Sequence, residues 1–253
     1  MNKKTIVNYA RSGNLQKVRE ELLAGADVNL GEGKATALSF ACTFGDFEMA
    51  KLLIENGANV NALDSDRCTP ISWAGNGGYI DIVKLLLEHG AEVNAGGEHG
   101  LTPLIHAAVR GETEIVALYL ENGAKAKHSS GTTALIHACS FGFLDTAKLL
   151  LPYSDINHQN KDGLTALMKA SEDNHIELTE LLLQNGADTN LSDKAFSATA
   201  LMKSAVNGNF EVVKLLVSYG ADIMAKDKKG RTVLDMCKRH QKLHRYLNEI
   251  KDK

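Results

Sequence analysis

Residues 69–91, TPISWAGNGGYIDIVKLLLEHGA, contain the pattern that decides the fold. Thr69-Pro70 is typical of a helix start, because threonine caps helix N-termini and proline is tolerated in the first turn. The glycine pair at 77–78 breaks this helix. Apolar residues spaced every three to four positions then predict a second helix over 79–87, which Gly90 closes as a C-cap. The stretch therefore predicts two short helices followed by an extended turn.

The same pattern recurs along nearly the whole chain. Thr-x-Leu triplets, with isoleucine in place of leucine after Thr69, recur at steps of 33, 33, 31, 32, 34 and 33 residues, beginning at Thr36, Thr69, Thr102, Thr133, Thr165, Thr199 and Thr232. Gly-Ala pairs follow at 25–26, 57–58, 90–91, 123–124, 186–187 and 220–221. One helix pair cannot bury its apolar face alone, whereas stacked pairs form a continuous core. The chain is therefore expected to be an all-α solenoid.

These units resemble the ankyrin repeat. Residues 102–108, Thr-Pro-Leu-Ile-His-Ala-Ala, are close to the family's opening motif, with the histidine one place later than usual. Gly-Ala-Asp-Val-Asn at 25–29 matches the family's loop. The resemblance implies an ankyrin-repeat solenoid of stacked helix-turn-helix units with protruding β-turn tips. We expect a single domain over 1–253, consisting of an N-terminal cap unit (1–30), six internal repeats (31–225) and a C-terminal cap unit (226–253).

Some positions depart from the family pattern. After Leu151 the expected Gly-Ala is missing, and Pro152-Tyr153 stands in its place. Without glycine the helix must end differently, so we expect a locally altered twist or a shorter tip there. Arg67 and Ser197 stand at tip positions where the family prefers glycine.

Composition restricts the class of protein. The 253 residues are 44% hydrophobic and 23% charged, with a net charge of −3, which is typical of a globular chain and not of a whole-chain nucleic-acid binder. No apolar run is long enough for a transmembrane helix, and the N-terminus lacks the apolar segment of a signal peptide. The four cysteines form neither a disulfide framework nor a metal pair, and Cys42 and Cys139 are expected to be buried. We therefore expect a cytoplasmic protein of a reducing compartment without a membrane partner.

No recognisable catalytic constellation is present in the sequence. His175-Ile176-Glu177 lacks the Pro-Cys-x-x-Cys that would make it a zinc-deaminase motif, and it stands at a repeat position. His106 and His137 occupy equivalent points of adjacent units, about one stacking interval apart, so their rings are not expected to converge on one zinc ion. We expect no catalytic residue, no metal, no cofactor and no small-molecule substrate. An enzyme with an unrecognised groove site stays a remote alternative.

The candidate partner-binding residues follow from the resemblance. Within the first helix of each unit, the fourth and eighth positions after the threonine lie one turn apart, and in the family this face lines the concave groove. Aromatic and arginine side chains there are typical of interface hot spots, although packing between units would also explain Trp73. The candidates are Phe44, Trp73, His106, Arg110, His137 and Phe141 in the groove, and Asp66, Arg67 and His99 at the tips.

Charge is unevenly distributed. Residues 226–253 hold ten Lys or Arg and four Asp or Glu, a net charge of +6, which leaves −9 on the rest of the chain. This segment could attract an acidic partner or nucleic acid, or be the solvated face of the terminal helix. Taken together, the sequence predicts a monomeric, non-catalytic module that binds a partner protein as an adaptor or inhibitor. A bacterial immunity protein that neutralises a toxin and a secreted host-directed effector are the alternatives; a nucleic-acid partner is not expected.

Overall fold

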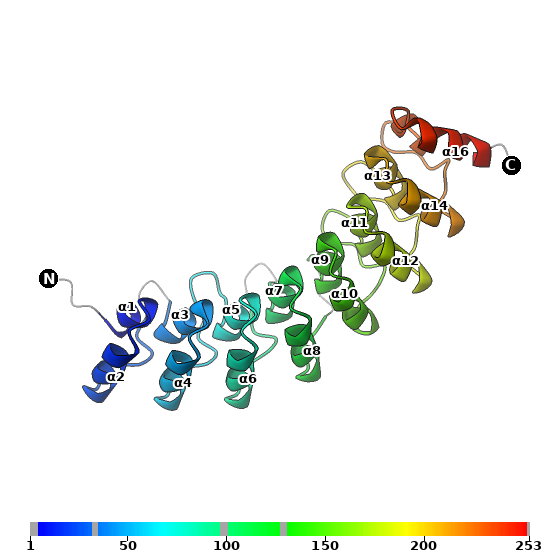
Figure 1. The fold of residues 1–253 in the computed structure, drawn as a ribbon. Coiled ribbons are helices and arrows are strands. Elements are labelled where there is room, and N and C mark those ends of the chain that lie inside the picture. Colours follow the sequence, from blue (N-terminus) through cyan, green and yellow to red (C-terminus); the bar gives the residue numbers. More distant parts are fainter. Residues whose placement is uncertain (1–4, 32–34, 97–100, 127–130, 252–253) are drawn as a thin grey trace. The chain divides into compact units, whose positions relative to one another are not determined.

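The computed structural model describes residues 5–31, 35–96, 101–126 and 131–251. In these ranges the chain is helical and forms no β-strand, although Ser192 and Thr199 make an isolated antiparallel bridge. The helices come in antiparallel pairs joined by short turns (Figure 1). The all-α prediction is therefore confirmed for the described residues.

Residues 1–125 form one compact unit. Its helices are α1 (Ile6–Arg11), α2 (Leu15–Leu23), α3 (Ala37–Phe44), α4 (Phe47–Glu55), α5 (Pro70–Asn76), α6 (Ile80–Glu88), α7 (Pro103–Arg110) and α8 (Thr113–Glu121). The first helices of successive pairs, α1, α3, α5 and α7, pack against one another, and the second helices form another layer. Among the described residues each pair therefore packs mainly against its neighbours, as in a solenoid.

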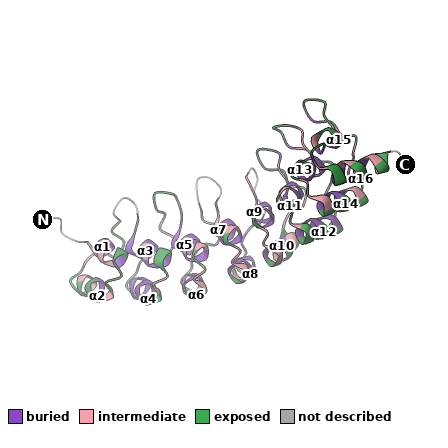
Figure 2. Cartoon of the chain, turned by 45° about the horizontal axis from the view of Figure 1, so that its top comes forward, coloured by how far each residue is buried: buried purple, intermediate pink, exposed green. Residues whose placement is uncertain are grey.

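Residues 126–253 form a second compact unit with the same internal order. Its helices are α9 (Ala134–Phe141), α10 (Leu144–Leu150), the 3-10 helix η1 (Leu151–Tyr153), α11 (Ala166–Glu172), α12 (Ile176–Gln184), α13 (Ala200–Asn207), α14 (Phe210–Ser218), α15 (Val233–Met236) and α16 (Gln241–Lys251). The loops before α13 and α15 stand out from the helices (Figure 2). The grouping of all units into a single domain, with the cap boundaries given above, stays a prediction.

The repeated threonines start the first helix of most units. The Thr36 hydroxyl accepts a hydrogen bond from the Ser39 N–H at 3.1 Å, and Thr199 accepts one from the Met202 N–H at 3.4 Å. Each bond satisfies a backbone donor that the helix itself leaves unpaired. At Thr69 the hydroxyl instead contacts the Ser72 hydroxyl at 3.0 Å, and proline occupies the first helical position.

In the core of the first unit, the large side chain of Tyr119 packs against Gly75, which has no side chain. Tyr119 of α8 is fully buried, and its hydroxyl donates to the Ile71 carbonyl at 2.7 Å. A Cβ atom at Gly75 would lie 2.3 Å from the Tyr119 hydroxyl oxygen, so only glycine leaves room for this ring. The hydrogen bond satisfies a polar group that would otherwise be buried at considerable cost.

The second unit contains the irregular helix end. Helix α10 ends at Leu150 and continues into η1, which contains Pro152. The Ser154 hydroxyl donates a hydrogen bond to the Leu150 carbonyl at 2.8 Å. Where a helix ends at a glycine, a backbone N–H donates to the corresponding carbonyl instead. The predicted difference in how this helix closes is confirmed.

Candidate partner-binding surface

Four of the tip loops that the structure describes are each held by one buried Asp or Asn side chain, Asp64, Asn160, Asp193 or Asp227. Asp64 accepts hydrogen bonds from the N–H groups of Asp66 and Cys68, both at 2.9 Å, on the same carboxylate oxygen. Asn160 and Asp227 bond two backbone N–H groups of their own tips in the same way. These bonds satisfy the turn's donors locally and fix its backbone.

A helix side chain takes the second carboxylate oxygen in two of these tips. The Trp73 indole N–H donates to Asp64 Oδ2 at 2.6 Å, and the Lys203 ammonium lies 2.9 Å from Asp193 Oδ2. Trp73 is half-buried, and its ring lies 6.1 Å from that of His106. The structure therefore gives Trp73 a positioning role for its tip, which favours the packing interpretation; a role in partner binding stays a prediction.

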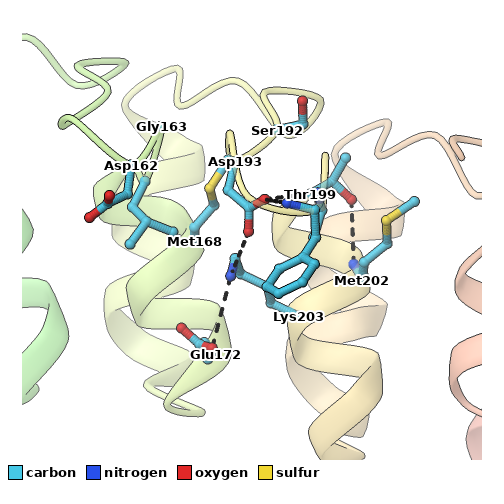
Figure 3. Close-up of polar contacts among 12 residues, drawn as sticks. Asp162, Gly163, Met168, Glu172, Ser192, Asp193, Thr199, Met202 and Lys203 are labelled. Atoms are coloured by element: carbon cyan, nitrogen blue, oxygen red, sulfur yellow. Dashed lines mark hydrogen bonds and ion pairs between the residues drawn. The ribbon is translucent and has the colours of Figure 1, made fainter. Parts of the chain in front are cut away.

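Figure 3 shows the Asp193 site, where charges are concentrated under the tip. Asp193 is buried, and its other oxygen accepts the Phe196 N–H at 2.8 Å and the Ala198 N–H at 3.3 Å. Burial alone would raise the pKa of Asp193, but these N–H groups and the Lys203 ammonium outweigh it and hold the pKa below its usual range. Glu172 Oε1 lies 3.9 Å from the same ammonium. The site is thus a fixed ion pair that ties the tip to α13.

The first unit exposes two of the predicted groove residues. Phe44 at the end of α3 is 58% exposed and stacks on Phe40 with a centroid distance of 6.2 Å. Arg110 ends α7 and is also exposed. His106 is half-buried, with Nε2 3.7 Å from Cys68 Sγ, and burial lowers its pKa although Asp64 opposes this. Phe44 and Arg110 can therefore contact a partner directly, whereas His106 is partly engaged.

The tips of the first unit agree with the expected positions. Asp66 and Arg67 are exposed. Arg67 has a φ of 56° and Ser197 in the second unit a φ of 55°, the left-handed region that favours glycine. The prediction that both stand at glycine positions is confirmed. His99 lies outside the described residues.

The second unit places its two predicted groove residues at one depression. The depression has a volume of about 500 Å³ and is lined by His137 and Phe141 together with Lys169 and Asp173. Phe141 is 55% exposed at its edge, with its ring centroid 6.1 Å from that of Phe143. Lys169 and Asp173 form an ion pair at 3.4 Å. An apolar side chain beside a paired polar rim is the arrangement found in protein interfaces.

Two features of the surface are absent from the sequence prediction. The first is the set of hydrogen bonds that Asp64 and Asp193 make within their tips. The only sequence pattern that could have indicated them is an acidic residue at the start of a turn. The other is Phe196, which is 60% exposed at the tip before α13. The sequence pattern that could have indicated this exposed ring is an aromatic residue inside a polar, basic loop.

Other expectations concern metals, membranes and cysteines. In the part of the chain that the structure describes, no three His, Cys, Asp or Glu side chains are grouped to hold a metal ion. None of the described helices combines the length and apolar character that a membrane crossing requires. Cys42 and Cys139 are fully buried as predicted, and burial raises the pKa of Cys139 to about 12.

Stacked helix pairs with projecting, internally bonded loops define an ankyrin-type solenoid. A model of the family "Ankyrin repeats (3 copies)" matches residues 6–97, 95–160 and 152–227, so the chain belongs to the ankyrin-repeat family. The human ASB11 ankyrin repeat domain has a similar structure, with a TM-score of 0.77 and 29% identity over 85% of this chain and 97% of that one. Ankyrin repeats are protein–protein interaction modules and generally serve as non-catalytic scaffolds.

Curated relatives share short segments with the chain. The photoreceptor ankyrin repeat protein of Homo sapiens is 46% identical over 57 residues, which are 22% of this chain and 13% of that protein. The serine/threonine-protein kinase TNNI3K of Mus musculus is 45% identical over 56 residues, which are 21% of this chain and 7% of the kinase. The Caenorhabditis elegans ankyrin repeat and KH domain-containing protein mask-1 is 41% identical over 61 residues, 24% of this chain and 2% of its own length. The chain thus matches only a small part of each relative.

Proposed function

We propose that this chain is a non-catalytic interaction module that binds a partner protein through the exposed groove residues and the tips, and acts as an adaptor or an inhibitor. We place it in the cytoplasm as a monomer. The observation that carries the proposal is Phe141, a phenylalanine 55% exposed at the edge of a 500 Å³ depression. Removing apolar surface from water stabilises a complex by about 25 cal/mol per Å² before the costs of association.

The first unit supports the same reading. Phe44 is exposed at the end of α3 and Arg110 at the end of α7, so both units present large side chains from their first helices. Phenylalanine and arginine supply contact area and charge that interface cores use. Both proposed roles, adaptor and inhibitor, require only that this surface binds the partner protein.

A pull-down from native lysate with the tagged chain, read by mass spectrometry, tests the proposal. The wild type is compared with an Arg110→Ala/Phe141→Ala variant that keeps its helical circular dichroism. Tyr153→Ala is the matched control, because Tyr153 is 51% exposed but lies in η1, away from the groove positions. We expect one protein to be captured by the wild type and the control and lost by the double variant.

Other results count against the proposal. Equal capture by all three chains would show that the groove residues do not bind the partner. Absence of any specific capture would contradict the binding function itself. If a partner is found and is an enzyme, inhibition of its activity by the purified chain separates an inhibitor from an adaptor.

A further inference from the structure

The last two tips of the second unit form a positively charged surface. Residues 192–197 and 226–231, here called the basic tip, hold five basic residues, Lys194, Lys226, Lys228, Lys229 and Arg231, and two acidic ones, Asp193 and Asp227. All five basic residues are exposed, whereas both aspartates are buried. Asp193 is paired with Lys203, and Asp227 accepts backbone N–H groups and pairs with Arg231 at 2.7 Å. The lysines therefore dominate the charge that a partner meets.

The two loops of the basic tip are joined. The Lys228 N–H donates to the Phe196 carbonyl at 2.9 Å, and the Lys228 ammonium also donates to the Lys194 carbonyl. The basic side chains and the 60% exposed Phe196 ring thus belong to one connected surface. Its backbone contacts do not depend on the side chains of Lys194 or Lys229.

A hollow lies beside this charged surface. It has a volume of about 270 Å³, and Phe196, Met202, Val206 and Met236 form the apolar part of its lining. The polar part of the lining contains Asn207 and two carboxylates that are paired with cations, Glu172 with Lys203 and Asp227 with Arg231. Val206 is 39% exposed there. The hollow is large enough for one aliphatic or aromatic side chain but has a single aromatic ring in its lining. Single-stranded nucleic acids are usually held on successive aromatic platforms, so this lining favours a peptide.

We propose that the basic tip binds an acidic segment of a partner protein, with Asp and Glu side chains facing the lysines and one apolar side chain covering Phe196 and entering the hollow. This rests on the proposed protein-binding function and adds the chemistry of the partner and a second place of contact. Charge complementarity supports it, because the basic tip, with five basic and two acidic residues, carries a net charge of +3, and its second loop belongs to a C-terminal segment (226–253) of +6, while the rest of the chain carries −9. An acidic segment is therefore attracted to this part and repelled elsewhere.

Selection of random twelve-residue peptides displayed on phage against the full-length chain tests the proposal. We expect the enriched peptides to contain several Asp or Glu around an aromatic or aliphatic residue. A fluorescein-labelled copy of the most enriched peptide is then titrated by fluorescence anisotropy. Raising the salt from about 50 to 500 mM should weaken its binding at least tenfold, since exposed charges are screened.

Two variants locate the binding site. Lys194→Glu/Lys229→Glu should weaken binding of the labelled peptide at least tenfold, and Phe196→Ala at least fivefold. All three side chains are exposed, so the fold should be retained, which circular dichroism checks. Lys51→Glu/Lys84→Glu is the matched control, because it makes the same charge change at two exposed lysines of the first unit. It should bind the peptide like the wild type.

Several outcomes would overturn the proposal. These are an absence of enriched peptides, enriched peptides without acidic residues, or equal loss of binding in the control variant. The surface would instead be a nucleic-acid site if a labelled oligothymidine of about twenty nucleotides bound more tightly than the peptide, and if the double lysine variant of the basic tip abolished that binding. Phe141→Ala separates the two proposals: it should leave peptide affinity unchanged, whereas partner capture depends on it.

Discussion

Replacing Asp193 tests whether the tips are held by their buried side chains. Asp193→Ala removes the one oxygen that accepts the Phe196 and Ala198 N–H groups, and with it the partner of Lys203, whose side chain is only 14% exposed. Asp193→Asn keeps an oxygen for the two N–H groups and removes only the charge. The tip at Asn160 shows that an amide oxygen can hold such a loop, with N–H contacts at 3.0 and 2.9 Å.

The structure allows the two costs to be separated. Asp193→Ala leaves the Phe196 and Ala198 N–H groups without an acceptor, which costs about 1 kcal/mol for each bond. It also removes the charge that faces the Lys203 ammonium, a further cost of about 1 kcal/mol, because Glu172 at 3.9 Å and solvent still compensate that ammonium. We therefore expect about 3 kcal/mol for Asp193→Ala, and about 1 kcal/mol for Asp193→Asn, which loses only the charge. For a chain of this size these correspond to decreases in Tm of about 6–12 °C and 2–4 °C.

Urea unfolding followed by circular dichroism at 222 nm measures both variants. Asp162→Ala is the control, since Asp162 is an exposed carboxylate at the neighbouring tip, and its free energy of unfolding should change by no more than about 0.5 kcal/mol. Equal costs for Asp193→Ala and Asp193→Asn would refute the assignment of the larger part to the backbone N–H bonds. A cost below about 1 kcal/mol for Asp193→Ala would refute the structural role of the site altogether.

Three further predictions concern backbone strain, pH and thiols. Arg67→Gly should stabilise the chain by about 0.5–1 kcal/mol in urea unfolding, because a left-handed φ costs an L-residue about 1–2 kcal/mol and glycine's extra unfolded-state entropy offsets only part of that; destabilisation would contradict the strain argument. Stability should fall as the pH drops below about 5, through the unfolded pKa of Asp193 of about 3.9 and on to its lower folded pKa, because only the unfolded chain takes up the proton in this range. Asp193→Asn should show a shallower pH dependence, and identical slopes would disprove this contribution. Cys42 and Cys139 should react with a thiol reagent only when the chain unfolds, since both are fully buried; mass spectrometry of the native chain after brief labelling would reveal any earlier reaction.

The repeated helices are predictable because their signals are local. A threonine, an apolar run and a glycine lie within one unit, and the capping bonds at Thr36 and Thr199 join residues only three positions apart. The unusual end of α10 is predictable for the same reason, since Pro152 stands where a glycine is missing. The exposure of Phe44, Arg110 and Phe141 also follows from their positions in the repeat.

The contacts between units cannot be predicted from one repeat at a time. Tyr119 and Ile71 are 48 residues apart, and the space for the tyrosine ring depends on a glycine at 75. The contact of Trp73 with Asp64 depends on how the tip folds back over its helix, which residue types alone do not specify. A groove position can therefore be predicted, whereas the choice between binding and packing requires the three-dimensional contacts.

The buried Asp and Asn side chains under the tips also determine the thermodynamics of recognition. Since Asp64 and Asp193 hold their loops by bonds within the chain, we expect these loops to keep the same backbone when a partner binds. Association at the tips then loses little conformational entropy, and its heat-capacity change reflects the apolar area covered and not the ordering of a loop. Calorimetry of a complex should accordingly resemble the docking of two rigid bodies.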